Sequence, residues 1–243
     1  MIYVDTGSAD TTRRRSKLLW DGFNFERARI GDPGYATLFF DDFSKGVAHY
    51  TATQATAGTF ALDTSVNYPV ALADCNSTTA TQGINVQLPG EYFLPAAGQT
   101  IIFEARFKFA DVATGPEFFI GLHEVDTTII ATSALSGSNM IGLSSVTDDN
   151  VCLFTAEKAT AADNHTGTTM VDGTWIKWGF RVNGVTNISQ YINGVEQASS
   201  TRHVTANIPI VALTPSLVCQ SGGTTDPIVH LDWWAVGQIP ATP

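Results

Sequence analysis

Two Asn-Gly pairs set in a run of alternating apolar residues constrain the fold of this chain most. In residues 175–182, WIKWGFRV, apolar side chains occupy every second position, which is the period of a strand with one buried face. Asn183-Gly184 follows this strand, and Asn193-Gly194 follows the next apolar run. Both pairs tolerate the positive φ that a tight reversal needs. The stretch therefore predicts two successive antiparallel hairpins, a β-meander.

Residues 100–109, TIIFEARFKF, show the clearest alternation in the chain. Three phenylalanines lie on one side of this predicted strand, and Glu104, Arg106 and Lys108 lie on the other. The pattern predicts that the phenylalanine side is buried and that the charged side faces water.

About a dozen short strands of this kind, separated by turn-forming residues, are predicted between residues 37 and 239. Residues 208–213 are among the predicted strands, whereas residues 160–167 are predicted to be a polar loop. No long segment has a helical period, and no apolar run reaches the length of a membrane span. The prediction is an all-β fold, an antiparallel two-sheet jelly-roll sandwich, with no membrane contact.

The net charge of −10 makes general attraction to nucleic acid unfavourable. The charge is unevenly distributed. Residues 1–31 hold six of the 13 basic residues and four of the 23 acidic ones, a balance of +2; seven basic and 19 acidic residues remain, a balance of −12. A basic leader ahead of an acidic body can dock onto an acidic neighbour, including another copy of the chain, or be a solvated tail.

The predicted organisation is an extended N-terminal arm over residues 1–36, a jelly-roll domain over residues 37–239 and a C-terminal tail over residues 240–243. The arm carries apolar side chains too large for a free tail, so it either packs on its own domain or inserts into a partner. The residues predicted to contact partner subunits are Arg13, Arg14, Arg15, Leu18, Leu19, Trp20, Phe23 and Phe25.

One pair of acidic residues invites a catalytic interpretation. Glu124 and Asp126 lie two residues apart, as a carboxylate pair at a sugar-cleaving centre would in a strand. They resemble the start of the E-x-D-x-x-E signature of β-jelly-roll glucanases, but Ile129 occupies the position of the second glutamate. The alternative is a strand end with exposed carboxylates that leads into a turn. We therefore predict no catalytic residues.

Other candidate sites are weaker. Asp41-Asp42 and Asp148-Asp149-Asn150 could supply oxygen ligands to calcium, although solvated turns give the same pattern. The histidines are scattered, and the three cysteines form no zinc motif, so no metal or other cofactor is predicted. Cys152 and Cys219 lie in apolar runs and are predicted to be buried.

Trp233 and Trp234 are adjacent, and in a strand they point to opposite faces. At most one of them therefore belongs to the core. The other stacks on a sugar or lies under a loop or a subunit.

Several segments together resemble a known family. These are Phe40-Asp41-Asp42-Phe43, FEARFKF, FFIGLHEVD, NMIGLSSVTDDN, the WIKWGFRV and QYINGVE meander, and the closing IVHLDWWAVGQ. Over about residues 37–239 the chain resembles the concanavalin A-like (laminin-G-like) jelly roll, in particular the versions in virion proteins of tailed bacteriophages. The matching residues mark the fold and carry no active-site motif.

This resemblance implies a non-enzymatic virion structural protein, of the capsid decoration (cement) type. Such a protein would be made in the cytoplasm of a bacterial host and would sit on the capsid surface. The implied partners are the major capsid protein and copies of the chain itself, as a homotrimer. Two alternatives remain: a carbohydrate-binding module of a phage head or tail, and a glycan-cleaving enzyme that uses Glu124 and Asp126. Deletion of residues 1–30 is expected to abolish association and leave a folded β monomer.

Overall fold

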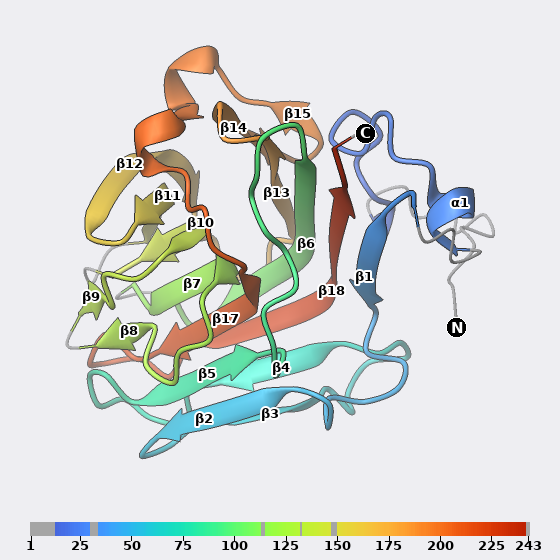
Figure 1. Cartoon of the computed structure of the whole chain (residues 1–243). Helices are drawn as coiled ribbons and strands as arrows, with labels where there is room; N and C mark the ends of the chain where they lie inside the picture. Colours follow the sequence, from blue (N-terminus) through green and yellow to red (C-terminus); the bar gives the residue numbers. More distant parts are fainter. Residues whose placement is uncertain (1–12, 30–33, 113–114, 132, 147–149, 242–243) are drawn as a thin grey trace.

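The computed structural model describes residues 13–29, 34–112, 115–131, 133–146 and 150–241. Within these ranges the chain is nearly all β, and two antiparallel sheets pack against each other (Figure 1). The predicted all-β, two-sheet sandwich is therefore confirmed. No helix in these ranges is long and apolar enough to cross a membrane.

The first sheet has nine strands in the described residues, and we call it the nine-stranded sheet. Seven of them follow one another in the order β15 (Val195–Glu196), β14 (Asn187–Ile192), β13 (Ile176–Asn183), β6 (Thr100–Ala110), β18 (Ile228–Ile239), β4 (Ala71–Asp74) and β3 (Thr59–Leu62). The other two are β1 (Thr37–Asp41), which pairs with β18, and β16 (His203–Val204), which pairs with β14.

The second sheet has seven strands in the described part of the chain, and we call it the seven-stranded sheet. Its order is β12 (Ala161–Thr169), β11 (Val151–Lys158), β10 (Met140–Ser145), β7 (Glu117–His123), β17 (Thr214–Gln220), β5 (Gly83–Gln87) and β2 (Thr51–Ala55). The remaining elements are the hairpin β8 (Ile130–Ala131) and β9 (Ala134–Leu135), the helix α1 (Phe25–Arg29), and two 3-10 turns, η2 (Ser199–Thr201) and η3 (Thr205–Asn207).

The predicted meander is present as β13, β14 and β15. Ile192 pairs with Val195, so the second reversal has two residues, Asn193 at φ 50° and Gly194 at φ 82°. Two consecutive residues of positive φ match the twist of the flanking strands, which is why an Asn-Gly pair forms this turn.

The core lies between the sheets and is rich in aromatic rings. Phe103 on β6 and Phe180 on β13 stack at 5.2 Å between centroids, and Phe118 on β7 contributes from the other sheet. The three cysteines belong to this core as reduced thiols, which confirms the predicted burial of Cys152 and Cys219.

Two predicted elements were wrong. Residues 161–169 form β12, an edge strand, although their polar composition predicted a loop. Edge strands face solvent on one side, so small and polar residues are tolerated there. Residues 208–213 are irregular, because Pro209 lacks the N–H that a strand ladder requires.

Candidate functional site

Residues 13–29, which we call the N-terminal segment, lie on the outer face of the nine-stranded sheet, next to β1 and β18 (Figure 1). Leu19, Trp20 and Phe23 are buried there, with at most 6% of their surface exposed. They form an apolar cluster, separate from the core between the sheets, with four residues of the nine-stranded sheet: Ile102, Tyr191, Trp233 and Ala235. These three side chains therefore pack on their own domain, which is one of the two alternatives predicted for the arm; the other was insertion into a partner.

Glycines on the sheet give the N-terminal segment room to approach. A Cβ atom at Gly237 would lie 2.6 Å from Phe23 Cε2 and 2.9 Å from Trp20 Cζ3. A Cβ atom at Gly179 would lie 2.7 Å from Leu19 Cδ2. A larger residue at Gly237 would push the segment away from the sheet, and the Cβ atom of one at Gly179 would also lie 2.3 Å from the backbone oxygen of Phe103.

Glu104 on β6 anchors the N-terminal segment by its carboxylate. The prediction that its side faces water was wrong for Glu104 and Arg106, which are 1% and 4% exposed, because the segment covers that face. Ser16 N donates to Glu104 Oε2 at 3.0 Å, Trp20 Nε1 donates at 2.7 Å, and Ser16 Oγ donates to Oε1. Burial raises the pKa of Glu104, and the hydrogen bonds from Ser16 and Trp20 oppose that shift.

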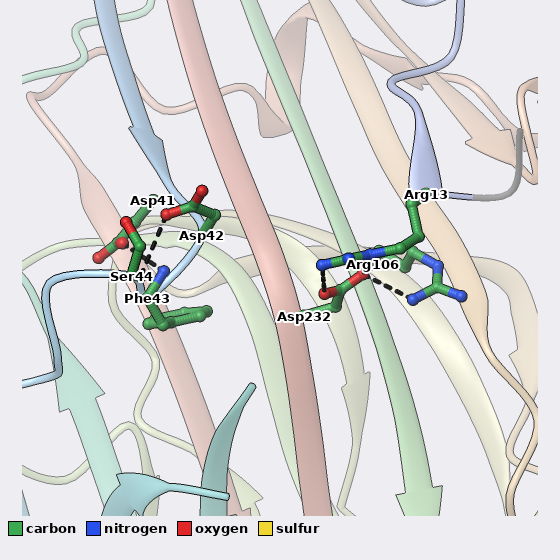
Figure 2. A network of polar contacts seen from close by, with 7 residues as sticks. All are labelled: Arg13, Asp41, Asp42, Phe43, Ser44, Arg106 and Asp232. Carbon is green, nitrogen blue, oxygen red and sulfur yellow. Dashed lines mark hydrogen bonds and ion pairs between the residues drawn. The ribbon is translucent and has the colours of Figure 1, made fainter. Parts of the chain in front are cut away.

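Asp232 on β18 forms a second anchor. The pairing of β18 with β6 shifts by one residue between Leu231 and Trp233, so Asp232 is the extra residue of a β-bulge. Its buried carboxylate accepts from Arg106 Nη1 at 2.6 Å and from Arg13 Nε at 3.0 Å (Figure 2). Arg13 thus ties the start of the described chain to a strand near its end.

A cavity of about 580 Å³ opens between the N-terminal segment and the sheet, and we call it the outer cavity. Its lining residues are Arg13, Arg14, Arg15, Ser16, Lys17, Trp20, Phe25, Phe40, Asp42, Tyr68, Pro69 and Trp233. Four of these side chains are cationic and one is a carboxylate, so the lining is basic although the whole chain is acidic. This arrangement favours an anionic ligand.

Guanidinium groups lie against aromatic rings in the wall of the outer cavity. Arg15 lies 3.6 Å from the centroid of Phe25, and Arg13 lies 4.2 Å from that of Tyr68. Such cation–π contacts hold the planar guanidinium groups in place, and Arg13 also donates to the carboxylate of Asp232.

Trp233 lines the outer cavity, and its indole nitrogen makes no hydrogen bond with a described residue. The bulge at Asp232 puts both Asp232 and Trp233 on the outer face, whereas Trp234 packs in the core. This confirms that the two tryptophans face opposite ways. The indole nitrogen of Trp233 is buried and has no acceptor among the described residues, while Trp234 Nε1 donates to Tyr50 Oη at 2.8 Å. A buried donor without a partner is costly, and a ligand oxygen would satisfy it.

The structure brings most of the predicted site residues together. Arg13, Arg14, Arg15, Trp20 and Phe25 line the outer cavity, whereas Leu19 and Phe23 pack against the nine-stranded sheet. Leu18 is 54% exposed.

Among the other lining residues, Phe40, Tyr68 and Pro69 were not predicted as site residues, and both anchors were missed. Asp42 was predicted only as a possible calcium ligand. The one sequence signal for the outer face of the nine-stranded sheet was the Trp233-Trp234 pair, since at most one of two adjacent tryptophans in a strand can belong to the core. Residues 1–12 and 30–33 of the predicted arm, and residues 242–243 of the predicted tail, lie outside the described residues.

The candidate catalytic pair follows a strand instead of lying in one, because β7 ends at His123. Glu124 Oε2 accepts from Asn139 N and Nδ2, both at 3.0 Å, and Asp126 Oδ1 accepts from Thr128 N at 2.8 Å. Asp126 thus bonds to the turn that follows it, as the alternative above expects, whereas Glu124 bonds to Asn139, directly before β10.

The Asp41-Asp42 pair also bonds to its own turn. Asp41 Oδ1 accepts from Phe43 N at 2.7 Å, and Asp42 Oδ1 accepts from Ser44 N at 3.1 Å (Figure 2). Asp41 Oδ2 accepts from Tyr50 Oη at 2.6 Å. These bonds engage both carboxylate oxygens of Asp41 and one of Asp42, oxygens that a calcium site would use as ligands. In the second candidate loop, Asp148 and Asp149 lie outside the described residues.

Solved structures with the same fold include lectins and an enzyme. The Lotus tetragonolobus seed lectin has a TM-score of 0.59 at 8% identity, covering 85% of this chain and 100% of that one. A carbohydrate esterase, vb_24B_21 from the Shiga toxin-encoding bacteriophage phi24B, has a TM-score of 0.54 at 16% identity, covering 82% and 96%. These likenesses establish the concanavalin A-like jelly roll that the sequence resembles, and nothing finer.

A third similar structure is SO2946 from Shewanella oneidensis MR-1, a protein of unknown function, with a TM-score of 0.55 at 12% identity and coverage of 86% and 89%. A search of curated proteins found no match. The family described as SO2946-like, C-terminal domain, matches residues 67–232. Because this match spans more than half of the sequence, the chain belongs to the SO2946-like C-terminal domain family.

Proposed function

We propose that this chain is a non-catalytic binding protein whose outer cavity takes a sugar that carries a carboxylate. The observation that carries the proposal is the buried indole N–H of Trp233, which lacks an acceptor among the described residues and belongs to a residue that lines the basic cavity. A ligand that supplies an acceptor would remove the cost of that unpaired donor.

The charge of the outer cavity supports an acidic ligand. Arg14, Arg15 and Lys17 lie at its rim or wall with Arg13, against the single carboxylate of Asp42. Guanidinium groups recognise carboxylates with two parallel N–H bonds, and the surrounding rings fix their planes.

The shape of the outer cavity and its fold support a sugar. Phe25, Phe40 and Tyr68 surround polar side chains, the mixture of apolar faces and hydrogen-bonding groups that small-molecule sites use. The Lotus lectin and the phi24B carbohydrate esterase have the same fold and carry names that refer to carbohydrate.

The acidic groups among the described residues that line the cavity support binding without glycoside hydrolysis. Hydrolysis of a glycosidic bond commonly needs two carboxyl groups on either side of the bond, about 5–9.5 Å apart. Among the described residues that line the outer cavity, Asp42 is the one carboxylate, and it accepts from Ser44 N at 3.1 Å.

The test is calorimetric titration with uronic acid oligosaccharides and with the same oligosaccharides after their carboxyl groups are reduced to alcohols. The wild-type protein should bind the acidic form, more weakly as salt increases, and should bind the reduced form less tightly. Trp233→Phe should weaken binding about threefold to tenfold, and Arg15→Gln about tenfold to a hundredfold.

The matched control is Trp175→Phe, which makes the same change at a tryptophan that does not line the cavity. The guanidinium of Arg106 lies 4.2 Å from the ring centroid of Trp175. The Trp175 variant should bind like wild type. Equal binding of acidic and reduced sugars, or equal loss in the Trp175 and Trp233 variants, would reject the proposal.

A structural role in a phage virion is a second candidate, favoured by one observation. Leu18 is 54% exposed on the N-terminal segment, directly after Lys17 and four residues after Arg14, which are both exposed, while the rest of the chain is acidic. An exposed leucine among cations suits contact with an acidic partner, such as the body of another copy or a capsid protein.

This second role has its own test. Leu18→Asp should reduce self-association in sedimentation velocity, and the chain should be found by mass spectrometry in purified phage particles. A wild-type protein that sediments as a monomer at all concentrations and is missing from particles would reject it.

A further inference from the structure

Three side chains that the sequence left scattered meet at the open edge of the sandwich. Asp163 and His165 alternate on β12, so they lie on the same side of that strand, and His203 lies on β16. His203 Nδ1 is 2.9 Å from Asp163 Oδ2, and His165 Nε2 is 3.3 Å from the same oxygen. The three donor atoms all lie within 4.8 Å of one another.

The two imidazoles have the surroundings of metal ligands. His203 is fully buried, and its ring lies 4.2 Å from that of Phe154, which fixes its orientation. The Nε2 atom of His165 is buried and makes no hydrogen bond with any described residue, although Asp163 is near. A histidine nitrogen without a donor or acceptor partner, directed at a carboxylate, is a free ligand atom.

The spacing of these atoms is close to that of a four-coordinate zinc site. Bonds of about 2.0–2.2 Å to nitrogen and oxygen place tetrahedral ligands about 3.4 Å apart. The two N–O distances of 2.9 and 3.3 Å are close to this value, and the third separation is at most 4.8 Å. The side chain of His165 is 24% exposed.

We propose that Asp163, His165 and His203 bind a divalent zinc-class cation, with a fourth position open to water. Two nitrogen ligands with one carboxylate favour Zn²⁺ and its neighbours in the first transition row over Ca²⁺ and Mg²⁺, which take oxygen ligands. The cation would join the edge strand of the seven-stranded sheet to β16 of the nine-stranded sheet, so it would close the sandwich at this edge.

The test is calorimetric titration of the metal-free full chain with ZnCl₂, together with its melting temperature in Zn²⁺, Mg²⁺ and Ca²⁺. One Zn²⁺ should bind per chain and raise the melting temperature, because a ligand of the folded state stabilises it, and Mg²⁺ and Ca²⁺ should not. His165→Ala should weaken Zn²⁺ binding by at least about tenfold, since loss of even an outer partner of a metal ligand commonly costs about 10–100-fold.

The matched control is His49→Ala, which removes a half-exposed histidine that also lies 2.8 Å from an aspartate oxygen, that of Asp41. It should bind Zn²⁺ like wild type. The melting temperature without metal shows whether His165→Ala is folded. If it is not, Asp163→Asn, which keeps the shape of the side chain, replaces it in the Zn²⁺ titration. Absence of Zn²⁺ binding to the wild type, or unchanged affinity in the folded His165 or Asp163 variant, would overturn the proposal.

Discussion

The neighbouring tryptophans Trp233 and Trp234 on β18 are expected to contribute differently to stability, because only one of them has a hydrogen-bond acceptor among the described residues. Trp234→Phe deletes the donor to Tyr50 Oη, whereas Trp233→Phe deletes an N–H without an acceptor among the described residues. We predict that Trp234→Phe lowers the free energy of unfolding by about 1–3 kcal/mol, while Trp233→Phe changes it by less than about 0.5 kcal/mol or raises it. Urea unfolding followed by fluorescence measures both. Equal losses would mean that Trp233 has a partner in the free protein.

His123 gives a pH prediction at the same scale. It is fully buried, with Nδ1 at 2.7 Å from the carbonyl oxygen of Glu124 and Nε2 at 3.3 Å from Ser136 Oγ. Burial lowers the pKa of His123 from 6.5, and the bond to Glu124 opposes the shift. Because the unfolded chain then binds the proton more tightly, this histidine contributes stability above pH about 6.5 that is lost as the pH falls towards the folded pKa.

The corresponding variant is His123→Asn, which keeps a donor near the position of Nδ1. Its free energy of unfolding should fall less between about pH 7 and pH 5 than that of the wild type, as measured by urea titration at both values. An unchanged difference between the two pH values would show that His123 titrates alike in the folded and unfolded chain.

At the scale of elements, sequence patterns gave the strands and their inward faces but not what covers the outer ones. The alternation in β6 correctly placed its phenylalanines in the core, because a period of two reports which residues share a face. It could not show that the N-terminal segment would bury Glu104, since that contact joins positions 88 residues apart. The bulge that brings Asp232 and Trp233 to one side is equally invisible, because it depends on an irregular pairing with β6.

The β12 edge strand shows the same limit for the histidine cluster. Its polar composition is that of a loop, and His203 lies 38 residues after His165 in the sequence, so no spacing motif joins them. The contact exists only because the edges of the two sheets come together.

The anchors of the N-terminal segment can be tested by proteolysis. Glu104→Ala removes the acceptor of Ser16 and Trp20, so the segment should separate from β6 more often. We predict that trypsin cleaves the basic run Arg13–Lys17 at least several times faster in this variant than in the wild type. Glu157→Gln, a change at another buried glutamate on the seven-stranded sheet, is the control and should be cleaved like wild type. Equal rates for the Glu104 variant would show that the anchor does not hold the segment.

On the scale of the whole molecule, the N-terminal segment is part of the sandwich's covering. Each of Leu19, Trp20 and Phe23 gains about 1.5–3 kcal/mol from burial, offset in part by the entropy lost in ordering the segment. Removing residues 1–25 would also expose Ile102 and Trp233.

We therefore predict that a chain lacking residues 1–25 melts at a lower temperature and self-associates through the exposed face, as followed by calorimetry and size-exclusion chromatography. This differs from the expectation from sequence, in which deletion of the arm leaves a folded monomer. A truncated chain that stays monomeric and melts at the wild-type temperature would restore that expectation.

The most direct measurement of the central claim is the NMR spectrum of the five tryptophan indole N–H groups during titration with a uronic acid oligosaccharide. The Trp233 signal, assigned from its absence in Trp233→Phe, should move to lower field as its N–H gains an acceptor, while the signals of the core residues Trp178 and Trp234 stay in place. A Trp233 signal that does not move while the sugar binds, or no binding at all, would contradict the account.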